Sequence, residues 1–317
     1  MIRAPQPAWR RLAVAAAAMA LCAAPGITGG GRRASAAAIS SPAPSARPRA
    51  HLAQGPIPLP AELAIPRYRP GAAPFANGET LVYDASWIGI PAAEARITLA
   101  YNPAHPGLWT GQMWITSSQA VDLVYRMRDY FRENFSRDSF APEDIYILQH
   151  EKKRFDEWRA AFDRNAHLVT AVKRNAQGRT WTRRFSGGDP WGPFSGAMMA
   201  LSQPLKPGQS YTFDIFSGGN RYVFEFAVMG RERIATALGT FDTLRIEPSV
   251  LWLSQGSFRS QARETTVWVT DDARHLPVRI ACAVFIGEVV ADLVKVSNAP
   301  APTRTAGSSA GAQAADP

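Results

Sequence analysis

Residues 230–248 constrain the fold more than any other stretch of this sequence. Two runs with strand character, Glu232–Ala237 and Thr240–Glu247, are separated by little more than Leu238-Gly239. Gly239 can adopt a positive φ at low cost, so a tight reversal of the chain is expected here. The alternation of apolar and polar residues slips at Thr243, which indicates either a β-bulge or two faces of mixed character. The stretch therefore predicts an antiparallel hairpin and shows no motif for a reaction.

Similar short runs recur along the chain, separated by turn-forming Gly, Asn, Asp and Pro residues. Between 92 and 101 the apolar and polar residues alternate with a period of two. The further runs cover residues 78–87, 108–117, 128–136, 144–149, 158–162, 168–173, 180–185, 210–216, 222–228, 250–253, 265–270, 276–285 and 288–296. This spacing is typical of an antiparallel meander rather than of βαβ units.

One or two short helices are expected among these strands. Ser195–Gln203 is the better candidate because Met198, Met199 and Leu201 give it an apolar surface to bury. Val121–Met127 fits either a short helix or the entrance to a strand. The sequence thus predicts a mainly β fold.

Residues 1–24 predict an export signal. Three arginines precede a short apolar run from Leu12 to Ala24 that ends among small residues. The run is too short to remain as a stable membrane anchor. Leu21 stands where a lipoprotein signal needs a small residue before Cys22, which argues against lipid attachment. We therefore expect a periplasmic or secreted protein with no transmembrane helix after signal removal.

The chain divides into further segments by composition. Residues 25–74 are rich in Pro, Ala, Gly, Ser and Arg and predict a disordered linker, and residues 299–317 predict a disordered tail. The linker could act as a tether or as a plain spacer. The remaining residues, 75–298, predict one β domain, large enough to be stabilised by its own core.

The net charge of +9 does not describe the domain. The span 75–298 holds 25 basic and 24 acidic residues, so a nucleic-acid partner is not expected. The strongest charge run in this span is Lys152-Lys153-Arg154, which suits a solvated strand edge or a ligand-binding patch. Cys282 would be the one cysteine left after signal removal; it lies in an apolar run and predicts a buried small side chain rather than a disulfide or a nucleophile.

Three elements of the sequence resemble those of a known family. They are the segment 230–241, the segment Trp268–Val278 and the start of the domain at Gly78–Ile90. Together they are similar to the domain of unknown function 3108 family of exported bacterial proteins, over roughly residues 77–296. The resemblance implies a single, strongly curved antiparallel sheet that forms an open barrel or spiral in the cell envelope. It implies no catalytic residue. Ala93-Glu94 departs from the glycine expected there, which puts the pairing of the first hairpin in doubt.

Motifs for chemistry are sparse. None of the five histidines, at 51, 105, 150, 167 and 275, has the spacing of a metal ligand, and no nucleophile elbow or phosphate-binding loop occurs. We therefore expect no cofactor and no metal, and assign no catalytic residue. Asp271 and Asp272 could bind a cation or raise each other's pKa, or simply stabilise a turn beside Arg274. Glu232 is a further polar candidate, although strand pairing with arginine explains it equally well.

Aromatic residues give the remaining signal. Eight tryptophans lie in the domain span, on or beside the predicted strands. They could form ordinary core, or line a concave sheet that holds an apolar ligand. The ligand-binding candidates are Trp87, Trp114, Trp191, Trp252, Trp268 and Phe194.

Three hypotheses follow. The first is a non-enzymatic envelope protein that binds a lipid, another apolar ligand or a protein partner. The alternative is an envelope hydrolase or carbohydrate-active module that uses Glu232, Asp271 or Asp272. The third is a purely structural domain that binds an envelope protein through a sheet edge.

Overall fold

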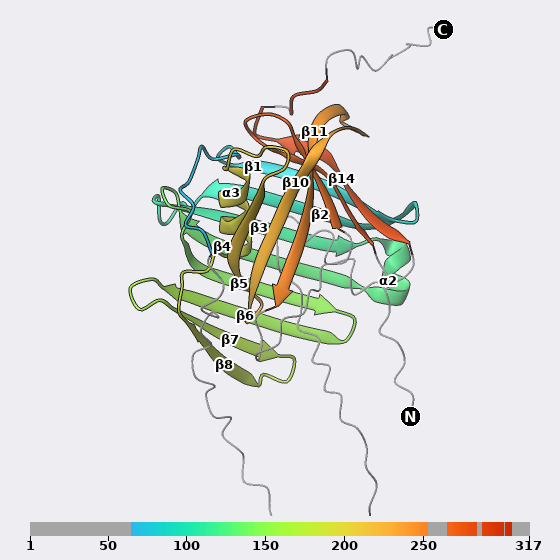
Figure 1. Cartoon of the computed structure of the whole chain (residues 1–317). Coiled ribbons are helices and arrows are strands. Elements are labelled where there is room, and N and C mark those ends of the chain that lie inside the picture. The colour runs from blue at the N-terminus through green and yellow to red at the C-terminus, as the bar shows by residue number, and fades with distance from the viewer. Residues whose placement is uncertain (1–64, 253–264, 284–286, 301, 306–317) are drawn as a thin grey trace, which may run out of the picture.

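The computed structural model describes residues 65–252, 265–283, 287–300 and 302–305. Within these ranges it contains fourteen strands and two helices (Figure 1). Their bounds are β1 Glu79–Trp87, β2 Ile90–Tyr101, β3 Leu108–Ser117, α2 Gln119–Tyr125, β4 Met127–Ser136, β5 Pro142–Glu151, β6 Arg154–Asp163, β7 Leu168–Asn175, β8 Thr180–Ser186, α3 Pro193–Leu201, β9 Ser210–Ser217, β10 Asn220–Thr236, β11 Gly239–Trp252, β12 Thr265–Thr270, β13 Pro277–Ala283 and β14 Glu288–Ser297. The predicted signal lies outside the described residues.

All these strands belong to one antiparallel sheet. β1 to β8 form one meander and β9 to β14 a second, and pairing of β1 with β14 joins the two. β8 and β9 remain as edges, so the sheet is not closed. Figure 1 shows how strongly it curls, with β10 and β11 crossing in front of β3 to β5. The predicted single curved antiparallel sheet is confirmed.

The strand sequences explain which face points inward. Every second residue of β4 is buried, in the order Met127, Asp129, Phe131, Glu133 and Phe135. The period of two sends these side chains to the concave face and their neighbours outward. Two carboxylates therefore enter the interior with the apolar residues.

The first hairpin has the irregularity that its sequence suggested. Ile88 and Gly89 both have a positive φ, 50° and 74°, as a tight two-residue turn requires. The register between β1 and β2 shifts so that Ala92 has no opposite residue. The extra residue is a β-bulge next to the segment whose pairing was in doubt.

The hairpin of β10 and β11 differs in detail from the expectation. The chain reverses at Ala237-Leu238, and Gly239 follows with a φ of 129°. The register shift lies in β10 at Met229, not at Thr243, and it bends one continuous strand where two runs were predicted. The slip at Thr243 reflects mixed faces instead, since the neighbouring Leu244 is also fully buried.

Both helices occur, with adjusted bounds. α3 begins at Pro193, two residues before the predicted start, because proline suits the first helical position. For Val121–Met127 the sequence allowed a short helix or the entrance to a strand, and the structure has the helix α2 at Gln119–Tyr125. Ser118 caps it by accepting a hydrogen bond from Val121 N at 3.3 Å.

Part of the segment expected to be a linker packs on the domain. The ring of Tyr68 stacks on Phe213 with centroids 4.6 Å apart, and its hydroxyl accepts a hydrogen bond from Thr212 N at 3.0 Å. Gln203 Nε2 donates to Arg69 O at 3.1 Å. The packed part of the chain thus begins before residue 75. At the other end, Thr305 N donates to Thr240 O at 2.9 Å.

Side chains bridge the gap between the two edge strands. Phe185 of β8 and Phe216 of β9 meet edge to face with centroids 5.1 Å apart. Arg221 Nη1 donates to Ser186 O at 3.2 Å, and Arg183 Nη1 donates to Gly219 O at 3.1 Å. We call this contact between β8 and the β9–β10 hairpin the seam.

A buried ion pair supports the seam. Arg221 Nε donates to Asp214 Oδ1 at 2.8 Å, and a second bond joins Arg221 Nη2 to Asp214 Oδ2. Both residues are buried, and burial raises the pKa of Asp214 although Arg221 acts against this. Removing one member would leave a buried charge without compensation.

We predict that Arg221→Met lowers the free energy of unfolding by about 3–5 kcal/mol, because Asp214 would stay buried and unpaired. The double variant Arg221→Met/Asp214→Leu should recover most of this loss. Arg233→Met is the control, since the Arg233–Asp242 pair is solvent-exposed and such pairs contribute about 0–1 kcal/mol. Urea unfolding measures all three. An equal loss in the control and in Arg221→Met would contradict the prediction.

Candidate functional site

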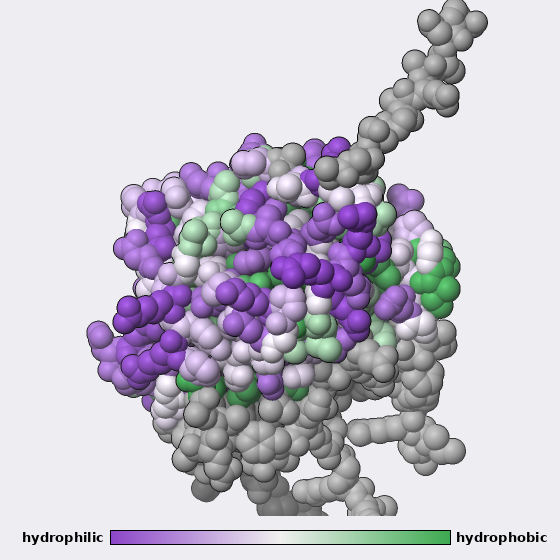
Figure 2. All heavy atoms as spheres, turned by 45° about the horizontal axis from the view of Figure 1, so that its top comes forward, coloured by the Kyte–Doolittle hydropathy of each residue, from purple (hydrophilic) through white to green (hydrophobic). Residues whose placement is uncertain are grey.

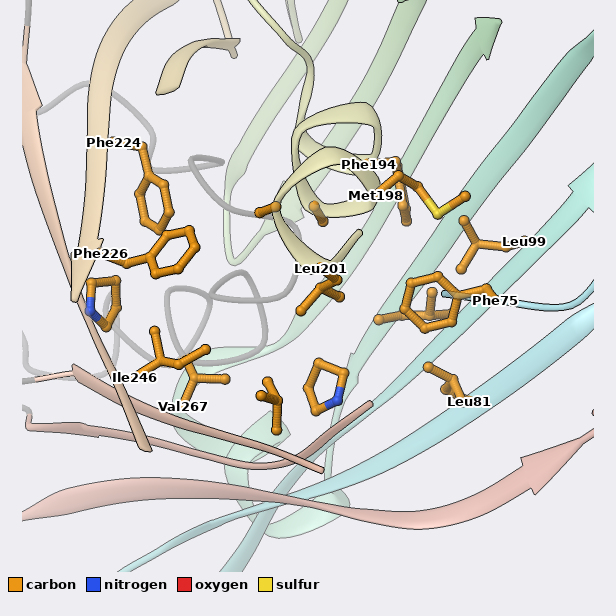
Figure 3. A pocket seen from close by; sticks show the side chains of 16 residues that line it. Phe75, Leu81, Leu99, Phe194, Met198, Leu201, Phe224, Phe226, Ile246 and Val267 are labelled. Carbon is orange, nitrogen blue, oxygen red and sulfur yellow. The ribbon is translucent and has the colours of Figure 1, made fainter. Parts of the chain in front are cut away.

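An apolar cavity lies between α3 and the concave face of the sheet (Figure 3). Its volume is about 70 Å³. Since roughly 10–15 Å³ on this measure holds one water, the space would take several waters or a short hydrocarbon segment. The described residues that line it are Phe75, Leu81, Ile97, Leu99, Phe194, Ala197, Met198, Ala200, Leu201, Phe224, Phe226, Ile246, Pro248, Val267, Val269 and Pro277.

The lining has one chemical character. None of these side chains carries a nitrogen or oxygen atom, so a water inside would find no side-chain hydrogen-bond partner. Cavities of this kind stay dry or take apolar molecules. The geometry therefore suits a hydrocarbon and not a polar substrate.

Two walls of the sheet face each other across the cavity. Figure 3 shows Leu201 of α3 between them, pointing into the space. Strands β10 to β12 form one wall. Strands β1 and β2 form the other, together with Phe75, which precedes β1 in the chain. The labelled side chains of these walls are Phe224, Phe226, Ile246 and Val267 on one side and Phe75, Leu81 and Leu99 on the other.

The sequence of α3 explains why the helix lies inside the sheet. Its residues from Pro193 to Ala200 are all buried, as expected for a helix that is apolar all round. Gly111 of β3 makes room for it, because a Cβ atom there would lie 2.5 Å from Phe194 Cγ. Any larger residue at 111 would push the helix away from the sheet.

Glu133 of β4 holds the N-terminus of α3. Its carboxylate accepts a hydrogen bond from Phe194 N at 2.6 Å and another from Ser195 N at 3.2 Å. These amides are among the helix donors that have no partner within the helix. A Cβ atom at Gly192 would lie 2.2 Å from a Glu133 carboxylate oxygen, so only glycine fits beside this contact. A buried acid thus fixes one wall of the cavity to the sheet.

Burial raises the pKa of Glu133 to about 7, although the hydrogen bonds from α3 act in the opposite direction. The pKa of Asp129, four residues earlier on the same face of β4, is shifted in the same direction. Its pKa is raised to about 7, first by burial and then by repulsion from Glu151. Asp129 Oδ1 accepts from His150 N at 3.0 Å, whereas Oδ2 has no hydrogen-bond partner among the described residues. Neither acid lines the apolar cavity.

The predicted aromatic residues are only partly brought together. Phe194 lines the cavity. Trp114 is exposed on the convex face and contacts Tyr130, with ring centroids 5.1 Å apart. Trp87, Trp191 and Trp268 pack partly buried against the core without lining the cavity. The side chain of Trp252 lies outside what the structure describes.

The predicted polar residues lie away from the cavity, in contacts that support the sheet. Glu232 accepts hydrogen bonds from Trp268 Nε1 at 2.7 Å and Arg245 Nη1 at 3.3 Å. Asp271 accepts from Arg231 Nε at 2.5 Å. The contact with Arg245 joins β10 to the neighbouring β11, and the other two reach across β11 to β12 and the turn that follows it.

Asp272 and Arg274 belong to the turn between β12 and β13. Asp272 Oδ1 accepts from Thr270 Oγ1 at 2.7 Å and from Arg274 N at 3.0 Å, as a turn aspartate does. Arg274 also pairs with the buried Glu79 at the start of β1. Among the described residues, no group of three or more His, Cys, Asp or Glu is arranged to hold a metal ion.

Sequence reasoning missed most of the cavity lining. It weighted tryptophan, whereas leucine, isoleucine, valine and phenylalanine form the walls. The alternation along β3 contains the missing signal, since Met113 and Ile115 point inward and therefore place Trp114 outward. The role of Glu133 had no such signal, because its partner lies some sixty residues away.

The fold and the cavity together define an open, strongly curved antiparallel sheet that encloses an apolar helix. The chain belongs to the family described as protein of unknown function DUF3108, whose model matches residues 82–294. No curated protein shows a significant match.

Three solved structures show low similarity. A beta-barrel-like protein of domain of unknown function DUF1849 from Brucella abortus has 10% identity and a TM-score of 0.45, covering 69% of this chain and 97% of its own. A Bacteroides fragilis protein, provisionally described as exported and with a YmcC-like fold, has 10% identity and a TM-score of 0.29 over 72% and 98%. A provisional lipoprotein from Parabacteroides distasonis has 8% identity and a TM-score of 0.30 over 73% and 100%. None of them assigns a function to this chain.

Neither of the two described helices has the length and hydrophobicity needed to cross a membrane.

We predict that Glu133→Ala lowers the free energy of unfolding by about 2–4 kcal/mol, because two buried amides of α3 would lose their acceptor. Glu133→Gln keeps an acceptor oxygen and should cost clearly less. Thermal unfolding of both variants tests this. Equal losses would show that the hydrogen bonds to α3 are not what Glu133 contributes.

The two buried acids also predict a pH dependence. Their folded pKa values, about 7, lie above the ordinary values of 4.5 for a glutamate and 3.8 for an aspartate, so the folded chain binds protons more tightly than the unfolded chain. Their contribution to stability is therefore complete below about pH 4 and is lost as the pH rises through 7. Melting temperatures should fall between pH 5 and pH 8, and Asp129→Asn should flatten this slope. A wild-type slope that the variant retains would contradict the assignment.

Proposed function

We propose that this protein is an exported, non-enzymatic component of the cell envelope that binds an apolar ligand of the acyl-chain class between α3 and the sheet. The observation that carries the proposal is the cavity of about 70 Å³, whose lining side chains hold no nitrogen or oxygen. Export and a periplasmic or secreted location rest on the signal sequence predicted at residues 1–24.

The size of the cavity limits what it holds. Pockets for drug-sized molecules measure about 300–1,000 Å³, so this cavity takes a short hydrocarbon segment and leaves the rest of the ligand outside. Burial of each methylene contributes about 0.8 kcal/mol, so a few of them give binding of modest strength. A single acyl chain with a polar head outside the cavity fits these limits.

The contacts of the acidic residues favour binding over hydrolysis. Glu232 lies on β10, and Asp271 and Asp272 directly follow β12; the side chain of each is hydrogen-bonded to a residue of the sheet. None of the three lines the cavity. An apolar ligand in the cavity would therefore meet no described carboxylate that could act on it.

The proposed organisation of the chain follows from this function. A signal at residues 1–24 is removed, and the Pro/Ala-rich segment 25–74 tethers the folded part, with its end around Tyr68 packed on the sheet. The β domain begins with the packed residues around Tyr68 and runs to about residue 298. The segment 299–317 forms the tail, of which Thr305 contacts the domain through Thr240 O.

We predict that Leu201→Trp reduces the affinity for a fluorescent fatty-acid probe at least tenfold, because the indole would fill the space into which Leu201 points. The same protein should keep its fold, as judged by circular dichroism. Met229→Trp is the matched control, since Met229 is exposed on β10 and does not line the cavity.

Mass spectrometry of organic extracts provides a second measurement. The purified wild-type protein should release an acyl-chain lipid in near-stoichiometric amount, and Leu201→Trp should release much less. An empty wild-type extract together with no probe binding would overturn the proposal.

A further inference from the structure

Three connections lie side by side at one end of the sheet: the β1–β2 turn, helix α2 and the β5–β6 turn. Ser118 joins the first two, since its Oγ donates to Pro91 O and its N to Ala92 O, both at 2.8 Å. Lys152 N donates to Arg126 O at 2.8 Å and joins the last two. We call the exposed side chains of these connections the α2-end surface.

Large apolar side chains gather on this surface. Leu123 and Val124 of α2 are 88% and 62% exposed, and Ile88 and Ile90 of the β1–β2 turn are 60% and 53% exposed. Among the described large apolar residues, Met229 alone is elsewhere exposed by more than half. Green spheres also gather at the right-hand margin of Figure 2, the side on which Figure 1 places α2 and the β1–β2 turn. A cluster of this kind marks an interaction site.

Cations accompany the apolar residues. Arg126 follows α2 directly, and Lys152 and Lys153 form the β5–β6 turn; all three are exposed. Asp122 of α2 is neutralised by Arg128, whose Nη2 lies 2.6 Å from its Oδ2. Glu151 is buried and accepts a hydrogen bond from the Tyr125 hydroxyl.

Exposed acids lie on the strands next to this surface. Glu94 of β2 is one of them, and Arg96 Nη2 lies 3.6 Å from its Oε1. Glu288, at the start of β14, is exposed, and its carbonyl accepts from Ile88 N at 3.4 Å. The three connections themselves carry three exposed cations and, in Asp122, one acid that Arg128 neutralises, so the α2-end surface is positively charged.

The combination of charge and hydrophobicity decides the partner. Two copies of the same surface would bring their cations together, which opposes a symmetric dimer. Anionic lipid head groups neutralise such cations, while the apolar side chains enter the boundary between head groups and acyl chains.

We propose that the α2-end surface docks this protein on a bilayer of anionic phospholipid. Ile88, Ile90, Leu123 and Val124 insert at the head-group boundary, and Arg126, Lys152 and Lys153 contact phosphates. This docking is independent of the cavity, which is lined by other residues.

Sedimentation of the full chain with vesicles tests the proposal. Vesicles of phosphatidylcholine with phosphatidylglycerol should bind the protein at low salt, and pure phosphatidylcholine should bind it much less. Leu123→Glu/Val124→Glu should weaken binding to the anionic vesicles at least tenfold, and Lys152→Glu/Lys153→Glu should do so at least fivefold. The arginine-rich residues 1–74 are the same in all variants, so these losses report on the α2-end surface.

Matched controls use exposed residues outside this surface. Met229→Glu and Lys206→Glu change an exposed apolar and an exposed basic residue and should bind like the wild type. A fluorophore at Val124→Cys, in a Cys22→Ser background with Cys282 buried, should shift to the blue on anionic vesicles. Binding that survives Leu123→Glu/Val124→Glu, or a label that stays in water, would overturn the proposal. A dimer lost in that variant without vesicle binding would instead identify a protein interface and equally overturn it.

Discussion

The hydrogen bonds between Glu133 and the N-terminus of α3 are the contact on which the interior depends. A curved sheet whose edge strands β8 and β9 do not pair with each other has a wide concave face, and α3 packs inside it. The one polar side chain of α3, Ser195, is bound to Gly192 N of its own N-terminus at 2.8 Å, so the backbone amides of the helix make the contact with the sheet. Glu133 provides the acceptor, and Gly192 and Gly111 provide the space in which the helix can approach. The cavity is the space that side chains leave unfilled between α3 and the two walls of the sheet.

This contact also explains why an acid is kept where burial is unfavourable. Desolvation raises the pKa of Glu133, yet the acid is tied to helix donors that would otherwise be buried without partners. Asp129 accepts one backbone hydrogen bond, from His150 N, and its Oδ2 lacks a described partner. The two acids on one strand thus have different roles: the first positions the cavity, and the second contributes mainly to the pH dependence.

The sequence predicted what depends on local order and missed what depends on distant contacts. Alternation located the strands, Gly239 located the reversal, and the apolar run around Met198 located α3. The choice of ligand-binding candidates by residue type was wrong for Trp114. The period of two along β3 places its side chain on the outer face of the sheet. The contact of Glu133 with Phe194, and the packing of Tyr68 on Phe213, join residues far apart in the chain. Neither has a signature in spacing, because partners of this kind meet only after the sheet has curled.

The seam between β8 and the β9–β10 hairpin gives this sheet a property that a closed barrel lacks. A closed barrel can be parted only by breaking a complete ladder of backbone hydrogen bonds. Here the described contacts across the gap are side-chain ones, such as the Phe185–Phe216 ring pair and the bonds from Arg183 and Arg221. The β9 edge is covered separately by the chain leading into α3, where Trp191 N donates to Asp214 O at 2.8 Å. The domain is therefore a rolled sheet closed along one line by side chains, and opening this line would break no backbone hydrogen bond between strands.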